Sequence, residues 1–209
     1  MFITFEGVDF SGKTTQAQML VDRLSRKHPV CFLREPGGTP ISERIREILL
    51  DRKNLELTDE AELLLFSASR AQLVTRVIRP ALLRGETVIC DRYYDSTTVY
   101  QGYGRGLDLD AVRTINTLAT NGLAPDLTIV VDIPVGEIER RKHASGKKFD
   151  RMESSGREFF DRVRNGYLAL CANEPQRVIR VDGLRPVEAI HADILNIVAQ
   201  KMGIQQQLV

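Results

Sequence analysis

A glycine-rich stretch near the N-terminus constrains the fold of this chain more than any other feature. Residues 7 to 14, GVDFSGKT, fit the pattern of a glycine, four free positions, a second glycine, a lysine and a Ser or Thr. The run MFITF before it is apolar, and Thr15 to Lys27 carries apolar side chains at helical spacing. Strand, glycine turn and helix in this order predict a loop that cradles the phosphates of a nucleotide.

The residue types of this loop suit phosphate binding. Glycines let consecutive backbone N–H groups curl around an anion, and the following helix directs its positive end at the same anion. We expect the lysine to neutralise the β- and γ-phosphates and the threonine hydroxyl to bind Mg²⁺. The predicted nucleotide-binding residues of the loop are Gly7, Val8, Asp9, Phe10, Ser11, Gly12, Lys13 and Thr14.

Predicted strands and helices alternate along the chain. The predicted strands are Phe2–Glu6, Val30–Arg34, Thr87–Asp91, Leu127–Asp132 and Arg177–Val181. Predicted helices cover 41–50, a long stretch from 58 or 59 toward 85 that Pro80 should bend or break, 110–119, 157–171 and 186–202. This pattern predicts one α/β domain over residues 1–209, a five-stranded, mainly parallel sheet flanked by helices on both faces, with residues 204–209 as a frayed tail.

Composition narrows the classes of function. The 29 basic and 28 acidic residues leave a net charge of +1, which gives no overall reason to expect nucleic acid or an anionic membrane. We expect no membrane span and no signal peptide, because no apolar run is long enough and the N-terminus enters the first strand directly. Cys31, Cys90 and Cys171 are odd in number and far apart, as expected of reduced thiols in a cytoplasmic protein.

Ligands of a parallel α/β sheet bind at the carboxyl ends of its strands, which predicts where the site lies. The residues that follow the strands are the glycine loop, 35–40, 91–96 and Asp132. Asp91 ends an apolar strand, at the second acidic position that phosphate-loop proteins use, directly or through water, to hold Mg²⁺. This position favours a metal role for Asp91 over the alternative of a helix N-cap. Arg92 follows directly, and Arg34 and Arg70 are further candidates for binding a phosphate or a base edge, although a single arginine is more often a surface residue.

The segment 140–151, RRKHASGKKFDR, is basic and lacks an apolar stripe. Taken alone it is typical of a solvated charge run, but behind a phosphate loop it predicts a mobile basic lid over the nucleotide. His28, His143 and His191 all lie away from the strand ends, so no general base is obvious. A phosphate acceptor needs none, since its second pKa near 6 leaves it mostly a dianion. An alcohol acceptor stays possible, because Glu35 is a carboxylate that could take the proton of an attacking hydroxyl.

Several blocks of the sequence together resemble bacterial thymidylate kinases, which transfer the γ-phosphate of ATP to dTMP. The blocks are FEGVDFSGKTTQ, LREPGGTPISERIREILL, AELLLFSASRAQL, VICDRYYDSTTVYQGYGRGL, NGLAPDLTIVVDI and, more loosely, FDRMESSGREFFDRVRNGYL. The resemblance covers nearly the whole chain. It implies a P-loop NTPase fold, ATP and dTMP as substrates, Mg²⁺ as cofactor and a homodimer.

The resemblance also implies roles for individual residues. Phe66 would stack on the thymine ring, and Arg70, one helical turn later, would reach a base carbonyl, whereas without the family Phe66 is equally well a core residue. Thr97 and Gln101 would lie near the base edge, and Tyr100 would close over the deoxyribose. The implied acceptor-binding set is Glu35, Phe66, Arg70, Arg92, Thr97, Tyr100 and Gln101, and Arg141 would lie against the donor adenine.

Phe10 indicates where the catalytic charge comes from. Some members of this family have an arginine directly after the loop aspartate, but here that position is Phe10, so the lid is expected to supply the charge. Lys147 and Lys148 replace arginines that are common in such lids, leaving Arg151 as the clear guanidinium. The predicted catalytic residues are Lys13, Arg92, Asp9 and Arg151, and which lid residue contacts the transferring group stays open.

Two other functions fit parts of this sequence. A deoxynucleoside kinase shares this fold and would use Glu35 to deprotonate a sugar hydroxyl of thymidine. A nucleotide-dependent switch with slow hydrolysis is disfavoured, because the sequence has no guanine-reading Asn-Lys-X-Asp and carries many candidate acceptor residues.

Overall fold

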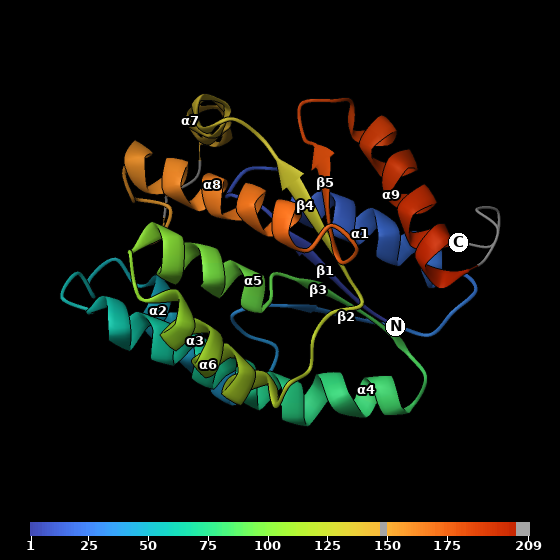
Figure 1. Cartoon of the computed structure of the whole chain (residues 1–209), viewed down its shortest axis with the longest axis horizontal. Helices are drawn as coiled ribbons and strands as arrows, with labels where there is room; N and C mark the ends of the chain where they lie inside the picture. Colours follow the sequence, from blue (N-terminus) through green and yellow to red (C-terminus); the bar gives the residue numbers. More distant parts are fainter. Residues whose placement is uncertain (147–149, 204–209) are drawn as a thin grey trace.

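Five parallel strands form the sheet at the centre of the molecule (Figure 1). The computed structural model describes residues 1–146 and 150–203. The strands are β1 (Phe2–Glu6), β2 (Val30–Arg34), β3 (Thr87–Asp91), β4 (Leu127–Asp132) and β5 (Val178–Asp182), in the order β2-β3-β1-β4-β5. The predicted sheet is confirmed, with β5 shifted by one residue, whereas the predicted tail 204–209 lies outside the described residues.

Helices cover both faces of this sheet. They are α1 (Lys13–Leu24), α2 (Pro40–Leu50), α3 (Asp59–Leu73), α4 (Arg79–Leu83), α5 (Tyr94–Thr97), α6 (Leu109–Thr120), α7 (Val135–Ser145), α8 (Arg157–Asn173) and α9 (Val187–Met202), with π-helical segments η1 (Val74–Ile78) and η2 (Thr98–Gly104). In Figure 1, α2, α3 and α6 lie together on one side of the sheet, and α1 and α9 on the other. No helix among the described residues is long and apolar enough to span a membrane.

Pro80 interrupts the long predicted helix, as expected. The chain leaves α3 through the π-helical turns of η1 and re-enters α-helical geometry at α4, where Pro80 occupies the first turn. Proline has no N–H to donate and its ring crowds the carbonyl four residues earlier, so a wider turn before it relieves the clash. The second π segment, η2, was not predicted, and it carries Tyr100 and Gln101.

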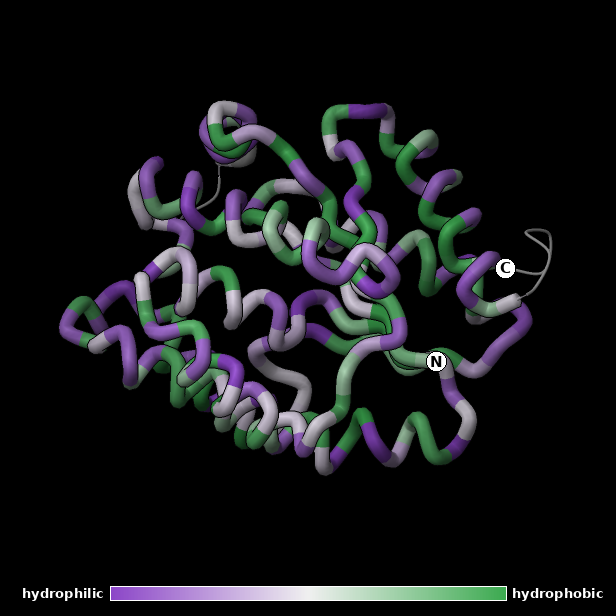
Figure 2. The backbone as a smooth tube through the Cα atoms, viewed as in Figure 1, coloured by the Kyte–Doolittle hydropathy of each residue, from purple (hydrophilic) through white to green (hydrophobic). Residues whose placement is uncertain are grey.

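Alternation along β1 divides the interior into two sides. Ile3 and Phe5 pack with Leu20 of α1 and Ile194 of α9, in the core on one face of the sheet. Phe2 points to the opposite face, where it joins a cluster with side chains of α3 and η1. Figure 2 shows hydrophobic residues along the central strands. Burying each apolar side chain contributes roughly 1.5–3 kcal/mol, so these two layers fix the sheet from which the functional loops project.

Asp132 supports the fold instead of the site. The sequence placed it among the functional residues because it ends β4, but its carboxylate accepts hydrogen bonds from Arg164 of α8 at 2.7 and 3.0 Å and from Arg180 of β5 at 3.0 Å. It is buried, and two guanidinium groups use its oxygens. The prediction for Asp132 was therefore wrong, because a neighbouring helix and strand supply cations that the strand-end rule does not take into account.

Candidate active site

The phosphate loop is closed against the sheet by glycines. Gly7 has a φ of +136°, and a Cβ on it would lie 2.5 Å from the carbonyl oxygen of Val131 on β4. Gly12, with a φ of +95°, caps the N-terminus of α1 in the left-handed region. Side chains are disfavoured in both conformations, so glycine is required for the turn that brings the backbone from β1 into α1. Lys13 and Thr14 consequently lie in the first turn of α1.

Thr14 and Asp91 form a site suited to a divalent cation. Thr14 Oγ1 donates a hydrogen bond of 2.5 Å to Asp91 Oδ2, and Asp91 Oδ1 is buried with no hydrogen-bond partner among the described residues. Parallel pairing of β1 with β3 sets Asp91 opposite Phe5, at the edge from which the loop begins. A hydroxyl beside a free carboxylate oxygen is the kind of oxygen donor set that Mg²⁺ takes, so the two residues fit the predicted metal role.

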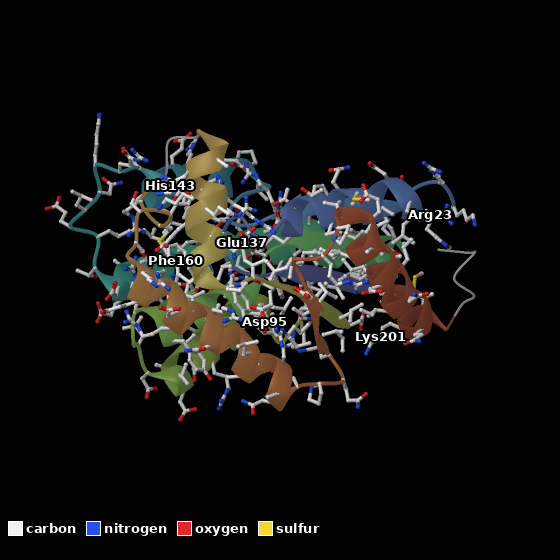
Figure 3. All side chains as sticks on the ribbon, turned by 90° about the horizontal axis from the view of Figure 1, so that it is seen from above. Arg23, Asp95, Glu137, His143, Phe160 and Lys201 are labelled. Carbon is white, nitrogen blue, oxygen red and sulfur yellow. The ribbon has the colours of Figure 1, made fainter. Side chains whose placement is uncertain are left out.

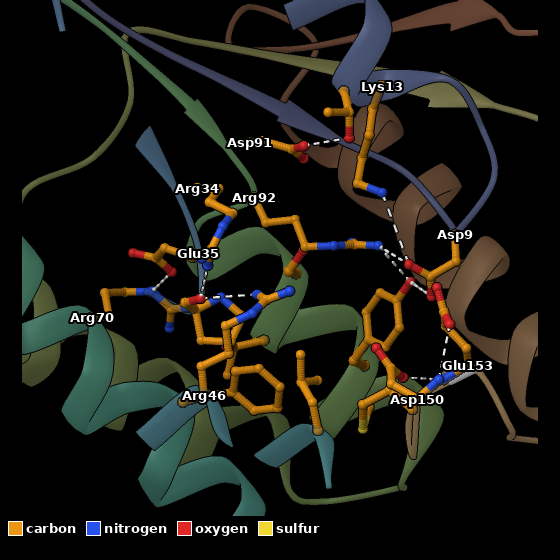
Figure 4. A pocket seen from close by; sticks show the side chains of 18 of the residues that line it. Asp9, Lys13, Arg34, Glu35, Arg46, Arg70, Asp91, Arg92, Asp150 and Glu153 are labelled. Carbon is orange, nitrogen blue, oxygen red and sulfur yellow. Dashed lines mark hydrogen bonds and ion pairs between the residues drawn. The ribbon is translucent and has the colours of Figure 1, made fainter. Parts of the chain in front are cut away.

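Arg92 lies at the centre of the cleft (Figure 4). Its backbone has a φ of +72°, which is strained for an arginine, and its N–H is held by the carbonyl of Phe5 at 2.9 Å. The guanidinium donates to Asp9 Oδ1 at 2.6 Å and to the Tyr100 hydroxyl at 3.1 Å. That hydroxyl donates in turn to Asp9 Oδ2 at 3.1 Å. Asp9 and Tyr100 thus fix the orientation of Arg92.

Burial and charge shift the pKa values of the groups around Arg92. Burial acts to raise the pKa of Asp9, but Arg92 and Lys13 overcome it and hold that pKa below its usual range. Burial, helped by Arg92, lowers the pKa of Lys13. Lys13 at the loop end of the cleft, which Thr14 and Asp91 also line, and Arg92 beside it are therefore desolvated cations that an anionic ligand would stabilise.

Glu6, which the sequence did not single out, is linked to Arg92 through two hydroxyl groups. Its fully buried carboxylate accepts from the Ser96 hydroxyl at 2.6 Å and the Tyr167 hydroxyl at 2.8 Å, and both hydroxyls also accept from Arg92. Burial, together with Asp95, raises the pKa of Glu6 to about 7. A glutamate at the end of a buried strand was the available signal, but nothing in the sequence links it to Ser96 or Tyr167.

The helix end of the cleft is lined by Phe66, Arg70, Thr97 and Gln101, from α3, α5 and η2. Phe66 is half-buried and lines the cleft, whereas a core residue would be fully buried. Arg70 is 2% exposed and donates to Glu35 Oε2 at 2.8 Å, while Glu35 Oε1 and Thr97 Oγ1 are buried without partners in the part of the chain that the structure describes. These unpaired oxygens are available to a ligand.

Glu35 and Arg70 form a buried ion pair. Their side chains are 3% and 2% exposed, and burial raises the pKa of Glu35 although Arg70 opposes the shift. Arg70 also donates to Asn116 Oδ1 and to the carbonyl of Tyr93, both at 3.2 Å. Glu35 therefore uses Oε2 to orient Arg70.

Two arginines from the second strand and the helix after it border the cleft. Arg46 of α2 donates to the Pro36 carbonyl at 2.9 Å, and Arg34 donates to the same carbonyl at 2.7 Å and pairs with Glu43. The sequence did not point to Arg46. It follows the buried Ser42 by four residues, which places both on one face of α2, but the sequence does not show that this face borders a cleft.

The predicted lid divides into a helical part and a part beyond it. Residues 140–145 continue α7, which Figure 3 shows with Glu137 and His143 along its length. Arg141 donates to Glu137, to the loop carbonyls of Phe10 and Ser11 at 3.2 Å, and to Gly183 at 2.9 Å, so it lies against the phosphate loop. The predictions for Lys147 and Lys148 lie outside the described residues.

Arg151 lies toward the helix end. Its guanidinium is 2.5 Å from Glu62 Oε2 and donates to the Leu49 carbonyl at 2.9 Å, with a side chain only 9% exposed. Arg151 is not among the residues that line the cleft with Lys13, and its guanidinium is directed to Glu62. After Arg151, Met152 and Glu153 line the cleft, and Figure 4 shows Glu153 on the same side of the cleft as Asp9.

A phosphate loop and a pair of oxygen-bearing side chains lie at one end of the cleft, and an aromatic ring with buried polar groups lies at the other. This arrangement is that of a P-loop nucleotide kinase. The family model described as Thymidylate kinase matches residues 5–194. The chain belongs to the thymidylate kinase family, and it is accordingly a nucleoside monophosphate kinase.

Individual relatives agree with this assignment over nearly the full length. Thymidylate kinase of Prosthecochloris aestuarii is 49% identical over 97% of this chain and 95% of the relative. That of Chlorobaculum parvum is 49% identical over 94% of both chains. The crystal structure of thymidylate kinase from Ehrlichia chaffeensis is 34% identical with a TM-score of 0.78, covering 95% of this chain and 97% of that one. These matches give no support to the deoxynucleoside kinase alternative.

Proposed function

We infer that this enzyme transfers the γ-phosphoryl group of ATP directly to the phosphate of dTMP, forming ADP and dTDP, a precursor of dTTP. The observation that carries the proposal is a single cleft, lined by Lys13 and Asp91 at the loop end and by Phe66 and Arg70 at the helix end, with Arg92 between them (Figure 4). A nucleotide bound at each end would direct its phosphates toward Arg92.

The charges of the cleft fit a phosphate acceptor. A nucleoside monophosphate is largely a dianion at neutral pH and attacks without a general base, so the enzyme must chiefly neutralise two polyanions and align them. Arg92 would hold the acceptor phosphate, with Asp9 and Tyr100 fixing its guanidinium, and Lys13 would contact the donor phosphates. Mg²⁺ held by Thr14 and Asp91 would neutralise charge on the β- and γ-phosphates.

The remaining predicted residues keep their proposed roles. Phe66 would stack on thymine, Arg70 would reach a base carbonyl, and Tyr100 would close over the deoxyribose. Arg141 would lie beside the adenine, a role supported by its hydrogen bonds to the Phe10 and Ser11 carbonyls. Arg151 would supply charge to the transferring group only after it leaves Glu62.

An acceptor assay tests the proposed reaction. ADP release would be measured with ATP and Mg²⁺, adding dTMP or thymidine as the sole acceptor, and with Mg²⁺ removed by a chelator. We expect turnover that requires both dTMP and Mg²⁺ and is far slower with thymidine. Release of ADP that ignores dTMP, or a preference for thymidine, contradicts the proposal.

We further propose that the enzyme is a cytoplasmic homodimer that pairs through α2, α3 and α6. These helices pack against one another and expose large apolar side chains that a partner copy would cover: Ile41, Ile48, Leu64 and Leu118 are 52%, 45%, 57% and 81% exposed. Apolar patches of this kind are typical of protein interfaces.

Charged substitutions in this patch test the dimer. The molecular mass in solution would be measured by light scattering for the wild type, for Leu64→Glu/Leu118→Glu, and for Leu83→Glu as a control on α4, where Leu83 is 87% exposed. We expect dimers for the wild type and control and a monomer for the double variant. A monomeric wild type, or a double variant that stays dimeric, would reject this surface.

A further inference from the structure

Glu62 of α3 lies behind the helix end of the cleft, and the reaction as proposed above does not use it. It is completely buried, and three side chains converge on its carboxylate. Gln101 Nε2 donates to Oε1 at 2.9 Å, Arg105 donates to both oxygens at 3.1 Å, and Arg151 lies 2.5 Å from Oε2. Burying a carboxylate with two guanidinium partners costs desolvation free energy. The third partner, Gln101, is neutral, and Glu62 determines the orientation of its amide.

The two guanidinium groups that contact Glu62 favour the ionised form of its carboxylate. Burial acts to raise its pKa, but hydrogen bonds from Arg105, Gln101 and Arg151 outweigh burial and lower the pKa below the usual value. An ionised carboxylate accepts hydrogen bonds and has none to donate. The amide of Gln101 must therefore turn its NH₂ group toward Glu62.

This contact fixes which face Gln101 offers to a ligand. The amide carries its donor and acceptor on opposite branches, so with Nε2 held by Glu62 the carbonyl oxygen Oε1 is directed away from Glu62. Gln101 and Phe66 both line the cleft, whereas Glu62 is not among the lining residues. The oxygen has no hydrogen bond to any residue in the described ranges, and Gln101 is only 1% exposed.

We propose that Glu62 is a positioning residue for substrate specificity, which locks the Gln101 amide with its carbonyl oxygen toward the acceptor base and thereby selects bases that carry an N3–H donor. The proposal rests on the proposed dTMP site at the helix end. Thymine and uracil carry a hydrogen on N3, which a carbonyl oxygen accepts. Cytosine presents a lone pair there, and two acceptors would face each other with no proton between them.

Discrimination of this kind is strong when the polar group cannot turn. A site built for one donor rejects an analogue lacking that donor because buried groups are left unpaired. A free glutamine could rotate its amide and offer NH₂ to cytosine instead. Glu62 prevents the rotation, since turning the amide would set two oxygens against each other in a buried site.

The substitution Glu62→Gln tests the proposal. Glutamine has the same shape but can accept from Gln101 or donate to it, so either orientation of the Gln101 amide becomes possible. We would measure dissociation constants of dTMP, dUMP and dCMP by calorimetry, and kcat/KM for each, in the wild type and the variant. We expect the preference for dTMP over dCMP to fall at least tenfold, whereas the dTMP to dUMP ratio and the KM for ATP stay unchanged.

Arg105→Gln is the matched control. It removes one ion pair of Glu62 but leaves the carboxylate beside Arg151, so Gln101 keeps its orientation and the dTMP to dCMP preference should persist. If Glu62→Gln weakens all three nucleotides equally, or if Arg105→Gln relaxes the preference as much, Glu62 has only a structural role and the proposal is overturned. A wild type that does not bind dTMP refutes the proposed function itself, which keeps the two failures distinct.

Discussion

The two ends of the cleft are built in different ways. The loop end consists mainly of eight consecutive residues, with Asp91 joined to them by pairing of β1 with β3. The helix end brings together Glu35, Arg70 and Glu62 with partners far away in sequence, such as Asn116, Gln101 and Arg151. Backbone geometry forms the first end, and buried charge pairs form the second. This contrast predicts that substitutions at the loop end affect catalysis, whereas those at the helix end also affect stability.

The largest expected effect is on catalysis at the loop end. Lys13→Ala should lower kcat by about a hundredfold to a thousandfold, because a preorganised cation aimed at developing charge is typically worth 10²–10³ in rate and Lys13 is proposed to contact the donor phosphates. Steady-state kinetics with ATP and dTMP measures it.

The same variant should keep its stability, which sharpens the contrast. Burial lowers the pKa of Lys13, so its surroundings do not stabilise the charged form in the absence of nucleotide. The free energy of unfolding in urea is expected to match that of the wild type. Near-normal turnover would refute the role of Lys13, and a large loss of stability would break the comparison.

At the helix end, Arg70→Ala should cost about 3–5 kcal/mol of folding free energy. The substitution leaves Glu35 buried without its cation, and breaking one side of a buried pair carries a cost of this size. Urea denaturation provides the measurement. Glu35→Gln/Arg70→Met, which removes both charges at similar volume, should recover most of the loss. A single variant less than about 1 kcal/mol below the wild type would show that the pair does not hold this end together.

Glu6 lies between the two ends and should make stability depend on pH. Its pKa in the folded protein is about 7, above the ordinary value of 4.5, so between these values the folded state binds more protons than the unfolded state. Stability then falls as pH rises through this window.

Glu6→Gln should remove that dependence. From pH 5 to pH 8 we expect the wild type to lose on the order of 2 kcal/mol more than the variant, since each unit of pKa difference is worth 1.36 kcal/mol. Unfolding free energies of both proteins at the two pH values measure this difference. Parallel pH curves for the two proteins would contradict the assignment.

The smallest expected effect concerns α6, the helix whose Asn116 accepts a hydrogen bond from Arg70. Asp108 caps this helix, accepting from the N–H of Ala111 at 2.8 Å, so Asp108→Ala should cost about 1 kcal/mol in thermal or urea unfolding. Asp110→Ala, in the same first turn but in an exposed pair with Arg113, should cost less than about 0.5 kcal/mol. Equal losses would mean that the cap does not anchor this side of the helix end.

Many of the residues that the sequence singled out line one cleft, because the signals that located them are local. The loop, the ends of β2 and β3 and the Phe66-Arg70 spacing depend on neighbours in the chain. The roles of these residues stay predictions. Asp132 failed because α8 and β5 supply arginines that pair with it. Arg46 and Glu6 were missed because their roles depend on which surfaces meet.

By itself, the sequence determined the parallel α/β sheet, the phosphate loop and the family, since hydrophobic periodicity, glycine positions and contiguous motifs are written along the chain. Only the tertiary structure decided the partners of the buried charges: Arg92 with Asp9, Arg70 with Glu35, and Arg151 with Glu62. Ion pairing in a desolvated interior depends on distances between residues remote in sequence, and only packing of the helices onto the sheet sets those distances.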